Sequence, residues 1–135
     1  MHSNEPKPAA QQSGRAAATI LLAEDHLDSR EALSALLEAF GFAVIPAVNG
    51  AEAVELARER HPDLILMDIM MPEVDGFEAT RRIRDFPETR HVPIITLTAM
   101  EGARDRAMEA GADDYLAKPI NSGQLLDKVR DWLNS

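Results

Sequence analysis

The sequence predicts an α/β domain built on a doubly wound parallel sheet, and three observations support this prediction. Short apolar runs alternate with segments of helical periodicity from Thr19 onward. The first run is continuously apolar, which is typical of a strand covered on both faces. Pro46 adjoins the second run and cannot donate to a sheet ladder, so that strand belongs at an edge. Together these features favour five parallel strands in the order 2-1-3-4-5, with five helices on two faces of the sheet.

Five apolar runs are the expected strands. The third run is the most apolar of the chain and is therefore expected at the centre of the sheet. In chain order, the expected strands cover residues 20–23, 42–45, 64–67, 94–98 and 115–117.

Cap signals and glycines delimit the expected helices between these strands. Asp28 with Glu31, and Asn49 with Glu52, have the spacing of a capping box, so we expect helices to begin at Asp28 and after Asn49. Gly41 is expected to end the first helix. Further helices are expected at about 77–84 and 102–110, and a last one after residue 121 or 122.

Composition narrows the classes of function. The chain has 135 residues, and 14 basic against 23 acidic residues give a net charge of −9, which disfavours direct binding to nucleic acid or an anionic membrane. Cysteine is absent, so disulfides and thiolate zinc sites are excluded. No apolar run approaches the roughly 20 residues that span a bilayer. We expect a cytoplasmic protein with a flexible tail or linker at residues 1–18 and one folded domain at 19–135.

Polar side chains follow four of the five expected strands, and they suggest a common site. Because the 2-1-3-4-5 order places the carboxyl ends of strands 1, 3, 4 and 5 side by side, these side chains should converge. Clustered carboxylates suit Mg²⁺, which prefers oxygen ligands, and a carboxylate nucleophile beside a cation has the parts for phosphoryl transfer. The converging residues are Glu24, Asp25, Asp68, Thr98 and Lys118.

These residues stand in motifs that closely resemble response-regulator receiver domains. The resemblance covers roughly residues 19–133, in the order and spacing of that family, and it implies the flavodoxin-like form of the doubly wound fold. Each motif alone is weak, but together they are highly specific. The motifs are Glu24-Asp25, Asp68-Ile69-Met70-Met71-Pro72 with Gly76 beyond it, Thr98-Ala99 and Lys118-Pro119.

The resemblance implies a phosphoacceptor and a magnesium site. Asp68 would take a phosphoryl group from a phosphohistidine. Asp25, Asp68 and the backbone carbonyl of Met70 would bind Mg²⁺ directly, and Glu24 would act mainly through a coordinated water. Many family members have Asp at the position of Glu24, but the longer side chain still reaches a metal-bound water.

The resemblance also implies a switch. Lys118 would pair with Asp68 at rest and with the phosphoryl oxygen afterwards, and the bond from Lys118 to Pro119 would be cis. Thr98 would turn inward to the phosphoryl group, and Tyr115 would follow as the switch aromatic. Asp68, Thr98 and Lys118 are thus the expected catalytic residues. The output surface would comprise the fourth helix, the fifth strand and the last helix.

The implied partners are a sensor histidine kinase or a histidine phosphotransfer protein as phosphodonor, and an unknown downstream protein. We expect a monomer or a weak phosphorylation-dependent dimer. The chain would catalyse only its own phosphorylation and dephosphorylation, because it ends two residues after Leu133 and leaves no room for an output domain. Two alternatives stay open: a pseudo-receiver that is never phosphorylated, and the C-terminal receiver of a hybrid histidine kinase.

Other functions and sites are disfavoured by the motifs. A hydrolase with an Asp nucleophile would need a second Asp two residues after Asp68, where Met70 stands, and no glycine-rich nucleotide-binding motif occurs. Met70 and Met100 are expected to flank the phosphoryl group. The histidines His2, His26, His61 and His91 lack ligand spacing and are expected at the surface, although His26 directly follows the acidic pair and could modulate the site.

Overall fold

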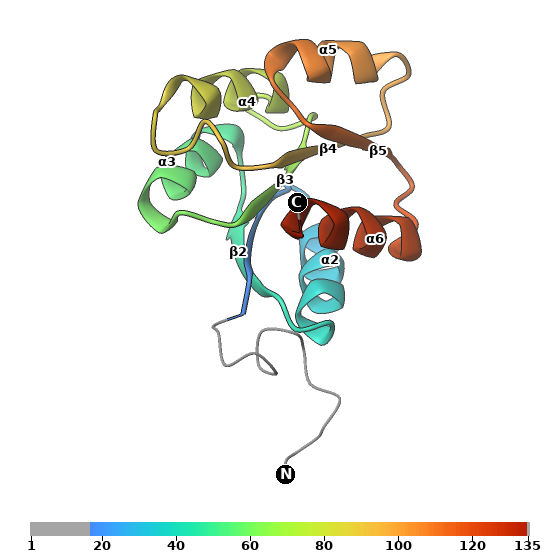
Figure 1. Cartoon of the computed structure of the whole chain (residues 1–135). Coiled ribbons are helices and arrows are strands. Elements are labelled where there is room, and N and C mark those ends of the chain that lie inside the picture. The colour runs from blue at the N-terminus through green and yellow to red at the C-terminus, as the bar shows by residue number, and fades with distance from the viewer. Residues whose placement is uncertain (1–16, 135) are drawn as a thin grey trace.

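The computed structural model describes residues 17–134 and contains one five-stranded parallel sheet in the order β2-β1-β3-β4-β5 (Figure 1). This confirms the predicted fold and strand order. Most of the tail expected at residues 1–18 lies outside the described residues. The strands are β1 (Thr19–Ala23), β2 (Ala43–Ala47), β3 (Leu64–Asp68), β4 (Ile94–Thr98) and β5 (Asp114–Ala117).

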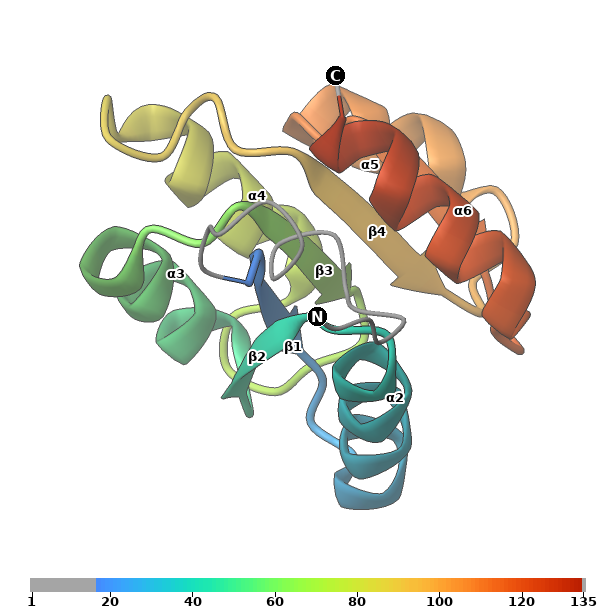
Figure 2. The same ribbon diagram turned by 60° about the horizontal axis from the view of Figure 1, so that its bottom comes forward.

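Five helices within the described chain cover the two faces of the sheet. Helices α3, α4 and α5 pack on one face, whereas α2 and α6 pack on the other (Figures 1 and 2). The helices are α2 (Leu27–Ala39), α3 (Gly50–Arg60), α4 (Gly76–Asp85), α5 (Ala103–Ala110) and α6 (Ser122–Leu133).

Each face of the sheet has its own hydrophobic core, because successive strand residues point to opposite sides. All five residues of β3 are buried, as expected for the central strand. Alanines of α3 and α5 let these helices approach one face closely, whereas leucines of α2 and α6 fill the other. Leu37 and Leu125 are fully buried there, and each such side chain contributes about 1.5–3 kcal/mol of transfer free energy.

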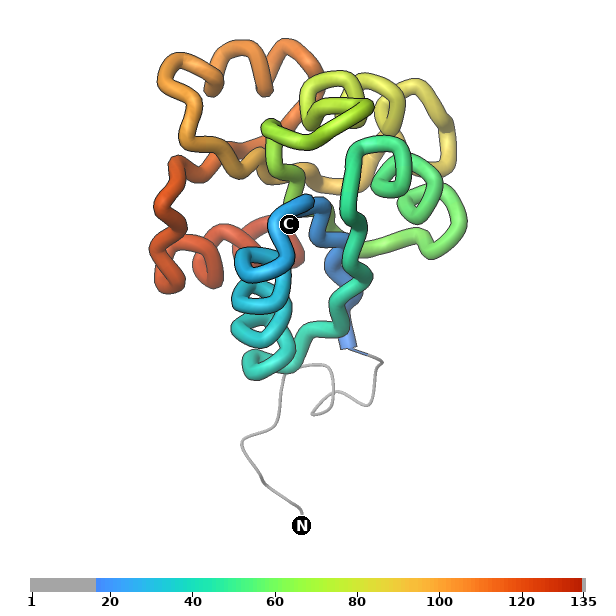
Figure 3. The backbone as a smooth tube through the Cα atoms, turned by 180° about the vertical axis from the view of Figure 1, so that it is seen from behind, coloured from blue at the N-terminus to red at the C-terminus, as the bar shows by residue number. Residues whose placement is uncertain are grey.

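Strand β2 lies at the edge of the sheet, as Pro46 predicted. Pro46 is exposed and pairs in register with Leu22 of β1. From behind, the chain can be followed along β1, back through α2 and along β2, which is the first crossover of the sheet (Figure 3). The crossover places the carboxyl end of β1 beside the start of α2.

The start of α2 differs from the prediction, whereas the start of α3 agrees with it. Helix α2 begins at Leu27 with His26 as its N-cap, and Asp28 is already helical. The backbone bond from Arg30 N–H to the His26 carbonyl, 2.9 Å long, closes a turn that begins before Asp28. At α3 the Asn49 side chain accepts the Glu52 N–H at 2.7 Å, which is the expected cap.

Two residues of α4 fix the position of this helix in the fold. A Cβ atom on Gly76 would lie 2.3 Å from the Asp68 carbonyl oxygen, so only glycine allows this close approach. Further along α4, Arg84 donates to the backbone carbonyls of Gly111, Arg90 and Val92 and to the Asp113 carboxylate, over 2.6–2.8 Å. This network fixes α4 to the segments that enter β4 and β5, and sequence reasoning did not anticipate it.

Candidate functional site

The acidic pair lies directly beyond β1, where it is held by the backbone. Glu24 is fully buried and its N–H donates to the Ala47 carbonyl at 3.0 Å. Arg30 of α2 donates to the carbonyls of Glu24 and Asp25, at 2.9 and 3.3 Å. Arg30 is therefore a positioning residue that sequence reasoning missed, because its contact depends on where α2 begins.

Lys118 joins the acids of two different strands. Its Nζ atom lies 3.1 Å from Glu24 Oε1 and 3.1 Å from Asp68 Oδ2. Its backbone N–H donates to the Thr98 carbonyl at 2.8 Å, and its bond to Pro119 is cis, as the resemblance implied. The sheet order thus brings β1, β3 and β5 together at one charged cluster.

The charges of this cluster shift one another's pKa values. Burial and the neighbouring Glu24 carboxylate raise the pKa of Asp68 to about 6, although Lys118 opposes this. Burial also acts to raise the pKa of Glu24, but the His26 N–H and Lys118 hold it below its usual value. Burial acts to lower the pKa of Lys118, but Asp68 and Glu24 hold it above its usual value. Lys118 therefore remains a cation at neutral pH.

The donor atoms at this end of the sheet fit a divalent cation. Asp25 Oδ1 is buried and has no hydrogen-bond partner among residues 17–134. Carboxylate oxygens of Glu24 and Asp25 lie within 4.8 Å of each other and of a His26 nitrogen, while Asp68 lies across from them on β3. The carboxylates of Glu24 and Asp25, with Asp68 at the end of the neighbouring strand, supply the oxygen ligands that Mg²⁺ prefers. The loop at Met70, the expected carbonyl ligand, directly follows Asp68.

Thr98 and Tyr115 occupy different positions relative to the cluster. Thr98 is fully buried at the end of β4, and its Oγ1 accepts the Met100 N–H at 2.8 Å. Tyr115 is half-buried on β5, where it pairs in register with Thr96. Strand alternation puts Thr96, Thr98 and Tyr115 on one face of the sheet. Tyr115 is thus separated from the charged cluster by the length of its strand.

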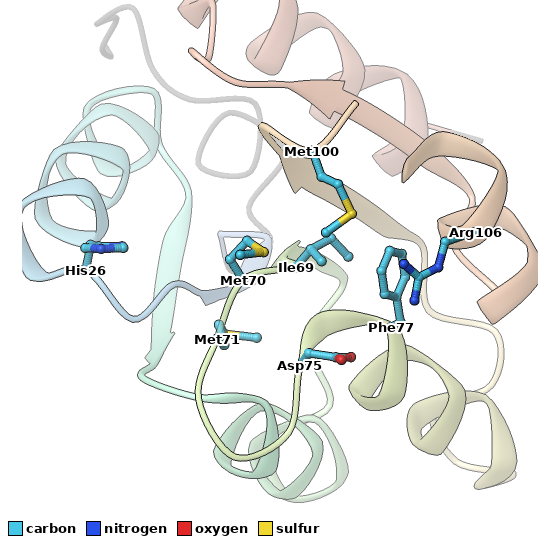
Figure 4. Close-up of a pocket in the computed structure, with 8 residues that line it drawn as sticks. All are labelled: His26, Ile69, Met70, Met71, Asp75, Phe77, Met100 and Arg106. Carbon is cyan, nitrogen blue, oxygen red and sulfur yellow. The ribbon is translucent and has the colours of Figure 1, made fainter. Parts of the chain in front are cut away.

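A cavity of about 560 Å³ adjoins the cluster (Figure 4). His26, Met70 and Met100 line one part of it, and Arg106 lies over the Phe77 ring at 4.2 Å in another. Both methionines line this cavity, but Asp68 is not among its lining residues, so their place beside the phosphoryl group stays a prediction. Its full lining is His26, Ile69, Met70, Met71, Asp75, Phe77, Met100 and Arg106.

The histidines within the described chain are exposed, as predicted, but one of them contacts the acidic pair. His26 Nδ1 lies 3.4 Å from Glu24 Oε2 and 3.4 Å from Asp25 Oδ1. His61 and His91 are also exposed, and His2 lies outside the described residues. His26 is therefore the one histidine of the described chain that contacts the acidic pair.

Comparison with known proteins identifies the family. The family model described as the response regulator receiver domain matches residues 20–130. The chain is a response-regulator receiver domain. This receiver is 39% identical over 117 residues to the polar-differentiation response regulator DivK of Brucella ovis, and the match covers 85% of this chain and 95% of DivK.

Solved receiver structures agree with this assignment. The receiver domain of the sensor histidine kinase PA1611 from Pseudomonas aeruginosa has a TM-score of 0.84 and 39% identity, covering 89% of this receiver and 100% of that chain. That crystal structure has a magnesium ion coordinated in its active-site cleft. The receiver domain of Ssk1 from Saccharomyces cerevisiae, crystallised with the histidine phosphotransfer protein Ypd1, has a TM-score of 0.80 and 31% identity, covering 86% of this receiver and 88% of that chain.

These relatives place the chain in two-component signalling, in which DivK is named as a response regulator. None of the helices between residues 17 and 134 is long and apolar enough to span a membrane.

Proposed function

We propose that this receiver accepts a phosphoryl group on Asp68 and thereby switches a protein-binding surface. The observation that carries the proposal is the position of Lys118, whose Nζ lies 3.1 Å from both Glu24 and the buried Asp68. An ammonium held on the acceptor carboxylate can neutralise the charge that a phosphoryl group brings. An ion pair with a purely structural role would not explain why Asp25, beside it, has a buried oxygen without a hydrogen-bond partner among the described residues.

The transfer itself is a substitution at phosphorus. An Asp68 carboxylate oxygen forms a bond to phosphorus, the bond from phosphorus to the donor's histidine nitrogen breaks, and its electron pair stays on that nitrogen. The raised pKa of Asp68, about 6, leaves most of the carboxyl ionised and nucleophilic at neutral pH. Lys118 stays charged and holds a phosphoryl oxygen after the transfer.

Mg²⁺ is the proposed cofactor. Asp25, Asp68 and the Met70 carbonyl would hold it directly, and Glu24 would act through a water. When bound, the ion supplies positive charge that reduces repulsion between the acceptor carboxylate and the incoming phosphoryl group. The unpartnered Asp25 oxygen and the magnesium ion in the related PA1611 receiver support this assignment.

Thr98 and Tyr115 are the proposed switch residues. Thr98 Oγ1 accepts the Met100 N–H, so its own hydroxyl hydrogen can be donated to a phosphoryl oxygen. Tyr115 lies on the same face of the sheet and is only half-buried, which leaves it room to move inward. The movement would bias the surface formed by α5, β5 and α6 between two states.

The proposed phosphodonor is a sensor histidine kinase or a histidine phosphotransfer protein. The complex of the related Ssk1 receiver with Ypd1 supports a donor of this kind. The relatives include a response regulator and the receiver of a sensor kinase, so both settings are represented for this fold. The downstream partner, the cytoplasmic location and the monomeric or weakly dimeric state stay predictions.

The test is phosphorylation by a small acyl phosphate in the presence of Mg²⁺, followed by intact-mass measurement. The wild-type chain should gain the mass of one phosphoryl group, and Asp68→Ala should not. Asp85→Asn, at an exposed acid that ends α4, is the matched control and should be modified like the wild type. No mass gain in the wild type would instead support the pseudo-receiver alternative.

The switch needs a separate measurement. Thr98→Ala should still be modified at Asp68, but the backbone amide signals of α5, β5 and α6 should move less on phosphorylation than in the wild type. Equal chemical-shift changes in both proteins would refute the coupling through Thr98.

A further inference from the structure

We propose that Gly50, the first residue of α3, positions the backbone of Met70 beside Asp68 by fixing the loop between β3 and α4. This loop covers residues 69–75. The inference rests on the proposed function, in which the Met70 carbonyl binds Mg²⁺ directly and Asp68 accepts the phosphoryl group.

Gly50 approaches the end of this loop at a distance that only glycine allows. A Cβ atom on Gly50 would lie 2.0 Å from the Val74 carbonyl oxygen and 2.8 Å from the carbonyl carbon. Real Cβ atoms essentially never approach another atom within 3.0 Å, so one of the two segments would have to move. Both atoms belong to the backbone, so a side-chain rotation cannot relieve the clash. Gly50 is not among the glycines with positive φ, so glycine is required here for space rather than for its backbone conformation.

Helix α3 is held in place more firmly than the loop. In its first turn the Asn49 side chain accepts the Glu52 N–H at 2.7 Å, and the Glu52 side chain accepts the Val48 N–H at 2.8 Å. Ala53 and Ala57 of the same helix are fully buried in the core, so a movement of α3 would open packing defects there. We therefore expect the loop to move when a Cβ atom is added at the start of the helix.

Hydrogen bonds within the loop transmit this movement to Met70. The Ile69 carbonyl accepts two backbone N–H groups, those of Met71 and Gly76, each at 3.0 Å. These bonds join the two ends of the loop, and Val74 lies between them in the sequence. A displacement of Val74 therefore shifts or breaks hydrogen bonds that lie directly beside Met70.

Met70 contributes two backbone groups to the site. Its N–H donates to Asp68 Oδ1 at 3.4 Å, and its carbonyl is the proposed ligand of Mg²⁺. Mg²⁺ demands near-ideal octahedral geometry with bonds of about 2.0–2.1 Å, so even a small displacement of the carbonyl weakens binding. Gly50 has no side chain and acts through its contact with Val74, which makes it a positioning residue.

The first test titrates magnesium chloride into the full chain, freed of metal, and follows the backbone amide signals by nuclear magnetic resonance. Gly50→Ala should bind Mg²⁺ about tenfold more weakly than the wild type. Gly123→Ala is the matched control, because it adds the same methyl group in the first turn of α6. That methyl group meets only the Asn121 side-chain oxygen, at 3.3 Å, so this variant should bind Mg²⁺ like the wild type.

A second control separates positioning from a general loss of stability. Val129 of α6 is fully buried in the core on the face of the sheet opposite α3, so Val129→Ala destabilises the domain away from the loop. Its Mg²⁺ affinity should equal that of the wild type. Equal affinity in Gly50→Ala and the wild type, or the same loss in Val129→Ala as in Gly50→Ala, would overturn the inference.

The metal-free protein gives a further readout. Gly50→Ala should shift the amide signals of Met70 and Met71, whereas Gly123→Ala should leave them in place. Unchanged signals in Gly50→Ala would also overturn the inference. If Gly50→Ala does not fold, Asn49→Ala tests the same contact more mildly, because it removes the side-chain cap next to Gly50. It should weaken Mg²⁺ binding by about twofold or more, and unchanged affinity would contradict the role of Gly50.

Failure of the proposed function would look different. A wild-type chain that takes no phosphate or binds no Mg²⁺ would refute the proposed function, whereas the role of Gly50 would still be judged by the Met70 signals of the metal-free variants. Phosphorylation and Mg²⁺ binding that are the same in Gly50→Ala as in the wild type would leave the proposed function intact and overturn this inference.

Discussion

Asp68→Asn should make the cation-free protein more stable at neutral pH, although it removes a side chain that pairs with Lys118. The ionised Asp68 is buried beside Glu24, and this cost exceeds the attraction of Lys118, since the pKa of Asp68 is raised from 3.8 to about 6. Asparagine has nearly the same shape and carries no charge. It therefore relieves the repulsion while filling the same space.

The size of the effect follows from the pKa. A rise of about 2 units, at 1.36 kcal/mol per unit, corresponds to about 3 kcal/mol of cost for the charged form of Asp68. The pKa of Asp68 is 3.8 in the unfolded chain and about 6 in the folded one. Between these two pH values the folded state therefore binds more protons. Ionisation of Asp68 therefore lowers the free energy of unfolding of the wild type as the pH rises from about 4 to about 6. The variant lacks this loss.

The assay is urea denaturation in a chelator, followed by the fluorescence of Trp132, which is the only tryptophan of the chain. At pH 7.5 the free energy of unfolding of Asp68→Asn should exceed that of the wild type by about 2–3 kcal/mol, and the gap should narrow toward pH 4. Asp85→Asn, at an exposed site, should stay within about 0.5 kcal/mol of the wild type. A variant less stable than the wild type at pH 7.5, or a gap independent of pH, would refute the reasoning.

Three further substitutions test packing and polar contacts of the domain. Gly76→Ala should lower the free energy of unfolding in urea by about 1–3 kcal/mol, because its Cβ would meet the Asp68 carbonyl at 2.3 Å, whereas Gly123→Ala should cost little. Leu37→Ala should lower the free energy of unfolding by about 2–5 kcal/mol in thermal or urea unfolding, since this side chain of α2 is fully buried in the core. Asp114→Asn should shift the Trp132 emission, because the carboxylate accepts the indole N–H at 2.8 Å. Because the pKa of Asp114 is lowered, its carboxylate should stabilise the folded wild type until the pH falls below about 3.8. Asp114→Asn should not show this loss of stability at low pH.

The strands could be predicted from local signals, whereas the convergence of the acids followed from the strand order of the predicted fold class. Continuous apolar runs mark buried strands, and the residues after them, such as Asp68 and Lys118, must meet at one edge of a parallel sheet. The start of α2 could not be predicted from cap spacing, because a backbone hydrogen bond to the His26 carbonyl closes the first turn earlier. The contacts of Arg30 and most contacts of Arg84 could not be predicted either, because their acceptors are backbone carbonyls, which are present in every residue type.

The contacts of Lys118 span 94 residues to Glu24 and 50 residues to Asp68. No short segment can reproduce them, because the charged cluster exists only when β1, β3 and β5 are all in place. A partly folded copy would keep its acids but lack the ammonium that steadies the acceptor. Assembly of the charged cluster therefore depends on the integrity of the whole sheet.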